Sequence, residues 1–549
     1  MADESVASGF GADERTVSSY FGAFAPAPAW HELVWWPPDV FALTNLILDH
    51  TGAYRFVVAP PRGRRWPPFP DWTERVSDAA EAWRDASSGL HGELPELVRT
   101  CWDTVTRFRD LPLERIKTGE ASELAAALLT LHAVADEACA EVASFGRRVS
   151  GSSFECRAWT LLQAQGSLSR LSPARVSIVP KTNFSGRGIT IRSLSRYLAL
   201  SYESVEVRWR TTEPGPSADP SDYHILLLPW PLTVRARDFR ATSANHLENM
   251  DSDRYGFFEF APGHSFDAEL VDELLEAAVD RAGRVDAVVL PEAAVYPEAL
   301  DELEVSLAHY GATFLIAGAR EAPEASALGR NYLHFGVRTR AGWNRYEQDK
   351  NHRWCLDEGQ IRQYHLSRAL DPRKLWWEAI EVRERALHVI DVGSGITTAP
   401  LVCEDLARLD EVADLVRRVG PSLVVAVLLD GPQLSSRWPC RYSRVLTDDP
   451  GSAVLTLTSF GMAARSRPHG RPRSRVVAHW NSAADGLHEI ALAPRASGIL
   501  MSTSVERSTV LTADGRRHTD VPRLKLAGLH QLRARPRRRG SAPALVRSS

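Results

Sequence analysis

Short apolar segments alternate with amphipathic ones over the second half of this 549-residue chain, and this alternation is the strongest constraint on its fold. The strand-like runs are 223–228, 285–290, 314–317, 332–339, 343–348, 387–392, 396–402, 423–428 and 453–459, and the helical segments are 267–282, 299–310 and 411–419. Short strands that alternate with longer helices form layered domains in which helices cover a sheet. The sequence therefore predicts an α/β fold here, with an inserted helical stretch around Trp376 and Trp377.

A segment rich in proline, serine and aspartate precedes this region at 212–222 (TEPGPSADPSD). Such breaks mark turns and linkers, so we place a domain boundary there. We expect a mostly helical domain over 1–215, the α/β domain over 222–510, and a basic, flexible tail over 511–549.

The first part of the chain shows helical periodicity. Apolar residues recur at steps of three and four within 72–83, 94–108 and 121–145. This pattern is typical of a seam buried inside a helical domain. Dimerisation through one of these faces is the alternative. We expect this part to bind a partner, to regulate the α/β domain, or to cover its pocket.

The overall charge gives no general reason to expect nucleic acid or an anionic membrane as a partner. The chain is 44% hydrophobic and 24% charged, with a formal net charge of -4. Basic residues gather locally at 533–539 (RARPRRR) and at the five arginines between 465 and 475. A solvated surface explains both runs. The alternatives are nucleic acid or an acidic partner for the first run, and an anionic substrate or partner for the second.

Several features predict a cytoplasmic protein. The opening residues MADESVASGF lack the apolar core of a targeting segment. The longest apolar runs, such as 422–429, are much shorter than the ~20 residues that cross a bilayer. The six cysteines form no CxxC pair, so neither a disulfide framework nor a zinc site is indicated.

Three polar residues end apolar runs in the α/β region: Glu292 in LPEAAV, Lys350 in DKNHRW and Cys403 in APLVCEDLA. Open α/β sheets place their functional sites at such strand ends. A free thiol has a pKa near ~8.5, so a nucleophilic cysteine needs a base or a positive neighbour. Glu292 supplies a base and Lys350 a positive charge that stabilises an oxyanion.

In order and approximate spacing, these residues resemble the Glu-Lys-Cys triad of the nitrilase (carbon-nitrogen hydrolase) superfamily. Leu290-Pro291-Glu292 and Cys403-Glu404-Asp405 resemble its conserved motifs, and the resemblance extends over about 223–506. It implies an αββα sandwich and an amidase-type hydrolase that forms a thioester on Cys403. It also implies a small amide or nitrile substrate, homodimers or larger assemblies, and no metal or organic cofactor.

The same resemblance suggests further site residues. Glu358 follows Lys350 by eight positions and matches the second glutamate of one branch of the superfamily, where it orients the lysine and the attacking water or amine. Glu378 is the rival, but it falls within the predicted helical insertion. His352 and Glu404 are candidates for substrate binding.

Residues 406–410 depart from the family pattern after the cysteine, so the resemblance does not identify the substrate. No SGGxDS-like loop is present, which argues against an NAD synthetase, and the missing spanning segment argues against lipid acylation. We expect a carbon-nitrogen hydrolase. The alternative is a catalytically weak or amide-transfer domain of the same fold that serves as a ligand-binding or regulatory module for the first part of the chain.

Overall fold

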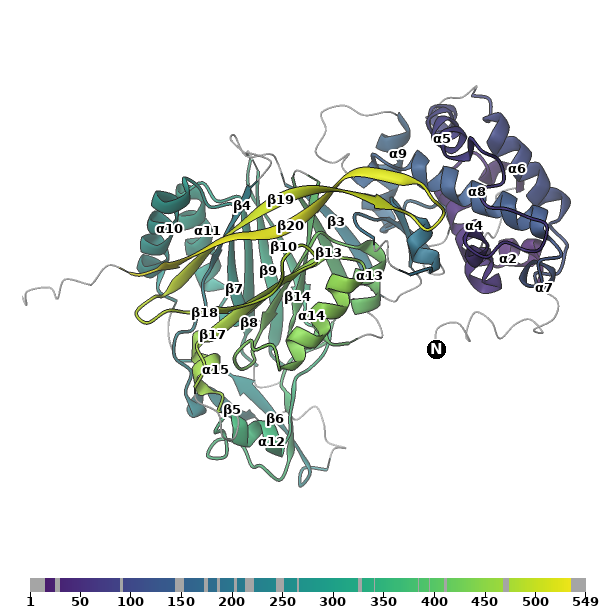
Figure 1. Cartoon of the computed structure of the whole chain (residues 1–549). Coiled ribbons are helices and arrows are strands. Elements are labelled where there is room, and N and C mark those ends of the chain that lie inside the picture. The colour runs from purple at the N-terminus through teal and green to yellow at the C-terminus, as the bar shows by residue number, and fades with distance from the viewer. Residues whose placement is uncertain are drawn as a thin grey trace, which may run out of the picture.

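Two seven-stranded sheets dominate the structure, which is a mixed α/β fold (Figure 1). The computed structural model describes residues 15–24, 30–88, 92–143, 153–171, 176–184, 188–201, 205–212, 222–242, 251–263, 266–323, 328–339, 341–383, 385–393, 395–408, 412–467 and 473–534. None of the helices within these ranges is long and apolar enough to cross a membrane.

The first large sheet has the strand order β10-β9-β8-β7-β4-β19-β20. Its strands are β4 (Asp222–Leu227), β7 (Ala287–Val295), β8 (Phe314–Glu321), β9 (Arg330–Thr339), β10 (Gly342–Asp349), β19 (Gly498–Leu511) and β20 (Arg517–Leu532). The second has the order β18-β17-β16-β15-β14-β13-β3. Its strands are β3 (Glu206–Thr211), β13 (Ala386–Gly393), β14 (Ile396–Val402), β15 (Leu423–Leu428), β16 (Ala453–Thr458), β17 (Val476–Ser482) and β18 (Gly486–Ala491).

The two sheets pack face to face, as the alternation of side chains along the strands shows. Val289 of β7 and Val425 of β15 belong to the apolar cluster between the sheets. Their neighbours Val288 and Val424 point the other way, each into the cluster on the outer face of its own sheet. Because successive side chains of a strand alternate between faces, a wholly apolar strand is buried on both.

Helices cover both outer faces. On the first sheet lie α10 (Ala268–Ala282) and α11 (Glu298–His309), and on the second lie α13 (Asp414–Val419) and α14 (Trp438–Asp448) (Figure 1). Helix α10 begins where the carboxylate of Asp267 accepts a hydrogen bond from the Leu270 amide at 3.1 Å, and ends at Gly283, whose φ is +79°. The order of layers is helix, sheet, sheet, helix.

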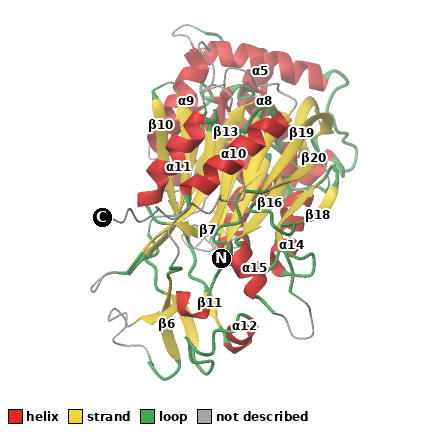
Figure 2. Ribbon diagram, turned by 90° about the vertical axis from the view of Figure 1, so that its left-hand side faces the viewer, coloured by secondary structure: helices red, strands yellow, loops and turns green. Residues whose placement is uncertain are grey.

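A smaller four-stranded sheet lies at one edge of the two large sheets, below them in Figure 2. Its elements are β5 (Phe239–Thr242), β6 (Tyr255–Phe260), β11 (Cys355–Leu356) and β12 (Leu375–Glu378), accompanied by η4 (Ala236–Asp238), α12 (Glu358–Gln363) and α15 (Phe460–Arg465). The prediction of helix around Trp376 and Trp377 is wrong, because both residues lie in strand β12. Trp376 pairs with Gly256 of β6, and the indole covers the space that a glycine leaves open.

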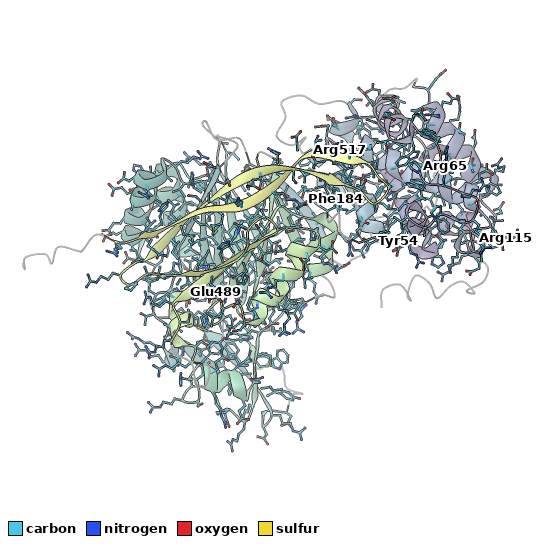
Figure 3. The ribbon with its side chains drawn as sticks, in the orientation of Figure 1. Tyr54, Arg65, Arg115, Phe184, Glu489 and Arg517 are labelled. Atoms are coloured by element: carbon cyan, nitrogen blue, oxygen red, sulfur yellow. The ribbon has the colours of Figure 1, made fainter. Side chains whose placement is uncertain are left out.

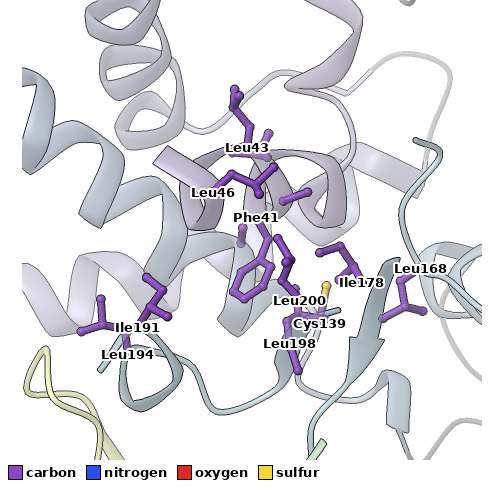
Figure 4. Close-up of a cluster of buried hydrophobic side chains, with 14 of the residues drawn as sticks. Phe41, Leu43, Leu46, Cys139, Leu168, Ile178, Ile191, Leu194, Leu198 and Leu200 are labelled. Atoms are coloured by element: carbon purple, nitrogen blue, oxygen red, sulfur yellow. The ribbon is translucent and has the colours of Figure 1, made fainter. Parts of the chain in front are cut away.

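The first part of the chain is helical up to Gln165. It contains α2 (Val17–Phe24), α3 (Trp30–Leu33), α4 (Pro37–Thr51), η1 (Ala53–Val57), α5 (Trp72–Ser88), α6 (Glu96–Arg107), α7 (Glu114–Lys117), α8 (Ser122–Ala138) and α9 (Ser153–Gln165). A two-stranded sheet of β1 (Ser177–Pro180) and β2 (Leu198–Ser201), with η3 (Ile191–Leu194), completes it. Figure 4 shows Phe41 of α4 beside Leu198 and Leu200 of β2 in their common core.

This first part is continuous with the α/β region. Strand β3 lies before the predicted boundary at 215, yet it pairs in parallel with β13 and is an edge strand of the second large sheet. The apolar cluster that holds the helices together also includes Leu401 of β14 and Val416 of α13. From the composition of the linker we had expected a separate domain over 1–215. The packing does not separate these residues from the rest of the chain.

The expected tail over 511–549 is also corrected in part, because Arg517–Leu532 form β20, which pairs along its length with β19. The tip of this hairpin reaches the helices of the first part (Figure 1). Buried Arg516 there contacts Asp136 at 3.1 Å, Glu137 at 2.8 Å and Asp514 at 3.0 Å. Figure 3 labels Arg517 and Phe184 at this junction. Residues 535–549, which hold most of the basic run, lie outside the described residues.

Candidate active site

Three strands bring Glu292, Lys350 and Cys403 into one buried site. Glu292 lies within β7, Lys350 directly follows β10, and Cys403 directly follows β14. The ammonium of Lys350 is 2.8 Å from Oε1 of Glu292. The charges of both residues act on the thiol of Cys403, and all three side chains are buried. The structure thus brings the three predicted residues together from strands of both sheets.

A bulge in β7 sets the direction of Glu292. The pairing of β7 with β8 shifts register between Leu290 and Val295, and Ala293 has a φ of +52°. Gly318 of β8 lies against this bulge: a Cβ placed there would be 2.2 Å from the Pro291 carbonyl oxygen and 2.4 Å from Cα of Glu292. Bulges re-aim side chains next to functional sites. Only glycine at 318 leaves room for this one.

Lys350 is held between two carboxylates. Its ammonium donates to Glu292 at 2.8 Å and to Oε2 of Glu378 at 2.6 Å. The amide of Asn331 donates to the same two side chains, at 2.8 Å to Glu292 and 2.6 Å to Glu378. The Leu429 backbone N–H donates to the second oxygen of Glu292 at 2.5 Å. These bonds fix the rotamers of both carboxylates and of the lysine.

The electrostatics of this group favour a charged lysine and a protonated thiol. Burial opposes the charge on Lys350, but Glu292 and Glu378 outweigh it and raise the pKa of Lys350 well above its usual value. Burial also raises the pKa of Glu292, against the attraction of Lys350 and with the repulsion of Glu378. Burial and then the charge of Glu292 raise the pKa of Cys403, against Lys350. The resting thiol is therefore neutral and needs a base to become a nucleophile.

Cys403 occupies a strained turn. Its φ is +45°, in the left-handed region that side chains with a Cβ rarely adopt, and it begins the short helix η6 (Cys403–Leu406). Such strain persists only where the surrounding structure enforces it, and it gathers at functional sites. The first N–H groups of a helix have no acceptor within the helix, so those of η6 are candidate donors to a group bound at Cys403.

Of the predicted substrate-binding residues, His352 lies against this turn and Glu404 lies within it. Nδ1 of His352 lies 2.8 Å from Asp405, and Asp405 also accepts from the Asn351 backbone N–H at 3.2 Å. These contacts tie the segment after Lys350 to the turn that carries Cys403. Glu404 is partly exposed and lies 3.6 Å from Arg408.

The structure does not bring Glu358 to Lys350, so the sequence-based choice of the second glutamate is corrected. Glu358 begins α12, its side chain is 57% exposed, and its carboxylate pairs with Arg362 at 2.5 Å. The carboxylate beside Lys350 is that of Glu378, at the end of β12. The reason is the wrong secondary structure assigned to 375–378: as a strand paired to β6 and β11, this segment carries Glu378 into the site.

Two residues of the site were not predicted as such: Glu378 was ranked below Glu358, and Asn331 was not identified. The sequence Leu375-Trp376-Trp377-Glu378 alternates exposed and buried positions and is rich in aromatic residues, a strand signal that could have identified Glu378. Asn331 has no comparable signal, because its role follows from the pairing of β9 with β10, which places it next to Lys350: the Lys350 N–H donates to the Asn331 carbonyl at 3.0 Å.

We expect Glu378→Gln to lower kcat by about 100-fold with KM unchanged, because a lysine released from one carboxylate shifts by a fraction of an ångström or more. Glu358→Gln is the matched control and should leave both constants at the wild-type values. Steady-state kinetics of the two variants on one substrate decide whether Glu378 or Glu358 is the second glutamate of the site. Equal losses in the two variants would restore Glu358 to the site.

Within the described ranges, no group of three or more histidine, cysteine, aspartate and glutamate side chains is arranged to hold a metal ion. The polar atoms of the site instead bond to one another, as shown above for Lys350, Asn331 and the two glutamates. The arrangement has a thiol, a carboxylate with a raised pKa and a fixed positive charge. These are the groups needed for nucleophilic attack on a carbonyl or nitrile carbon.

Solved structures of nitrilase-superfamily proteins resemble about half of the chain. Nit3 of Saccharomyces cerevisiae, of branch 10 of that superfamily, is 12% identical over 48% of this chain and 85% of its own, with a TM-score of 0.28. XC1258 of Xanthomonas campestris, a CN-hydrolase superfamily protein, is 14% identical over 56% and 90%, with a TM-score of 0.25. The C. elegans NitFhit protein is 12% identical over 48% and 56%, with a TM-score of 0.31.

No family model and no curated protein matches the chain. With TM-scores of 0.25 to 0.31, the structural likenesses say nothing about the reaction.

Proposed function

We propose that this protein is a carbon-nitrogen hydrolase of the nitrilase type, which cleaves a small amide or nitrile through a thioester on Cys403. One observation carries the proposal: a buried lysine is held between two glutamates, and the charges of Lys350 and Glu292 act on a buried cysteine in a strained turn. Burying three charged groups together costs several kcal/mol per ion before pairing. A core cysteine that serves packing alone needs no such neighbours.

The first half of the reaction acylates the thiol. Glu292 accepts the proton of Cys403 as the sulfur attacks the carbonyl carbon, so that the thiolate forms only during attack. Lys350 and the backbone N–H of Glu404 stabilise the oxyanion; one such donor is worth about 10²–10³ in rate. Glu292 then returns the proton to the departing amine, the carbon-nitrogen bond breaks, and the acyl group remains on sulfur.

The second half releases the acyl group. Glu292 removes a proton from water, the hydroxide attacks the thioester carbon, and the carbon-sulfur bond breaks. The sulfur recovers the proton from Glu292, which leaves a carboxylic acid and the free enzyme. Glu378 does not exchange protons in this scheme. It holds Lys350 in place, together with Asn331, through both steps.

The test is a panel of amides, carbamoyl compounds and nitriles incubated with the wild type and with Cys403→Ala. A true substrate should be hydrolysed by the wild type alone. Acid quenching of that reaction should leave the acyl mass on the peptide that contains Cys403, as read by mass spectrometry. Cys156→Ala, which removes an exposed cysteine, should retain both the turnover and the adduct. Equal hydrolysis by Cys403→Ala would refute the proposal.

A further inference from the structure

A hollow lined by arginines lies at the same edge of the sandwich as Cys403. Its volume is about 530 Å³. Four segments form it: residues 232–234, which follow β4; His365, which follows α12; residues 460–467, which comprise α15 and the residues after it; and residues 473–475, which precede β17. Gly461 allows two of these segments to meet, because a Cβ there would lie 2.7 Å from the backbone nitrogen of Val234.

Four arginines line this hollow: Arg465, Arg467, Arg473 and Arg475. Two of them are held in place by backbone carbonyls. Arg465 donates to the His365 carbonyl at 2.8 Å, while Arg475 donates to the Leu492 carbonyl at 2.6 Å and lies over the Phe460 ring at 4.4 Å. Carbonyl bonds orient a guanidinium and leave its charge in place.

None of the described residues that line the hollow is acidic. Asp238 acts on Arg465 only from farther away, and its own carboxylate accepts from the Arg235 backbone N–H at 2.6 Å. Four positive charges around one concave space favour an anion. Arginine binds carboxylates and phosphates through paired N–H donors.

The strand order places this hollow next to the catalytic group. β14, β15 and β16 are adjacent and parallel, so Cys403 after β14 and Phe460 after β16 lie at the same edge, two strands apart. At about 4.8 Å per strand, their separation across the sheet is about 10 Å. Val234 of the hollow belongs to the same apolar cluster as Ala293 and Leu429, which flank Glu292. Figure 1 shows α15 at this edge, between the large sheets and the small one.

We propose that the hollow binds an anionic group of the substrate, a carboxylate or a phosphate, at the same edge of the sheet as the thiol of Cys403. That the bound anion is part of a substrate rests on the proposed function, whereas the anion site itself follows from the arginines alone. The substrate class is then an amide or nitrile with a negatively charged group at its far end. A volume of this size fits a small molecule.

The experiment measures binding of inorganic phosphate and of succinate to the full chain by calorimetry. The wild type and Cys403→Ala should bind at least one of the two anions equally well, and the preferred one identifies the anionic group. Arg467→Ala combined with Arg473→Ala should weaken that binding at least tenfold, because each removes a charged donor. Arg99→Ala combined with Arg107→Ala removes the same charge from α6 and should leave the affinity unchanged.

Two results would overturn the proposal: no binding of either anion to the wild type, or equal affinity in the two double variants. Binding that depends on Arg467 and Arg473 without any hydrolysis in the substrate panel would preserve the anion site and refute the proposed function instead. Where a substrate is known, the Arg467 and Arg473 double variant should raise KM with little change in kcat, since the arginines lie away from the reacting bond.

Discussion

Lys350→Met is expected to lower the free energy of unfolding by about 3–5 kcal/mol, because it leaves two buried carboxylates without their cation. In the wild type the ammonium lies within 2.8 Å of Glu292 and 2.6 Å of Glu378. Methionine fills similar space but carries no charge, so one of the two carboxyl groups must take up a proton on folding. Urea denaturation of the wild type and the variant measures the loss.

The loss should depend on pH in a defined direction. Removing Lys350 removes the attraction that opposes burial at Glu292, so the pKa of Glu292 rises further in the folded variant. A folded-state pKa above the unfolded one means that the folded variant holds more protons, so the stability of the variant falls as pH rises through that interval. The deficit relative to the wild type should be smaller near about pH 5 than near about pH 8.

Lys525→Met is the matched control, since it removes the lysine of an exposed pair with Glu506. Exposed pairs contribute about 0–1 kcal/mol, so this variant should unfold near the wild-type midpoint. Lys350→Met should in addition lose at least about 10³-fold in kcat/KM, as expected for loss of an oxyanion donor whose charge also positions Glu292. A Lys350→Met protein as stable as Lys525→Met would show that the two glutamates are not charged in the folded chain.

The second large effect is expected from Gly318→Ala. The new methyl group would lie 2.2 Å from the Pro291 carbonyl oxygen and 2.8 Å from the Ala293 nitrogen, both backbone atoms that cannot rotate away. The bulge of β7 must shift, and Glu292 moves with it. We expect a loss of about 1–3 kcal/mol in the free energy of unfolding and of about 100-fold in kcat/KM, because a displacement near 1 Å misaligns the base with the thiol.

Gly263→Ala is the control for this substitution, since a Cβ at position 263 meets nothing within 4 Å. It should match the wild type in both urea denaturation and kinetics. Activity in Gly318→Ala equal to that of Gly263→Ala would mean that the position of Glu292 does not depend on the contact between β7 and β8.

The local patterns predicted the elements that carry the site. The apolar runs that lead to Glu292, Lys350 and Cys403 form β7, β10 and β14, as their periodicity indicated. A short run of alternating or continuous apolar residues favours a strand that is buried in a sheet, and this signal depends only on the residues of the run. The same reasoning failed at 375–378, where four residues are too few to tell a strand from a helix and the pairing with β6 decides.

The amino-acid sequence by itself determined the α/β character of the second half and the strands that carry, or directly precede, a carboxylate, an ammonium and a thiol. Both depend on neighbours a few residues apart. The tertiary structure alone decided which glutamate faces Lys350, that β3 completes the second sheet, and that Arg516 at the hairpin tip meets Asp136. These contacts join residues 28 to 380 positions apart. They are selected by packing and charge compensation in the assembled fold, which no local pattern contains.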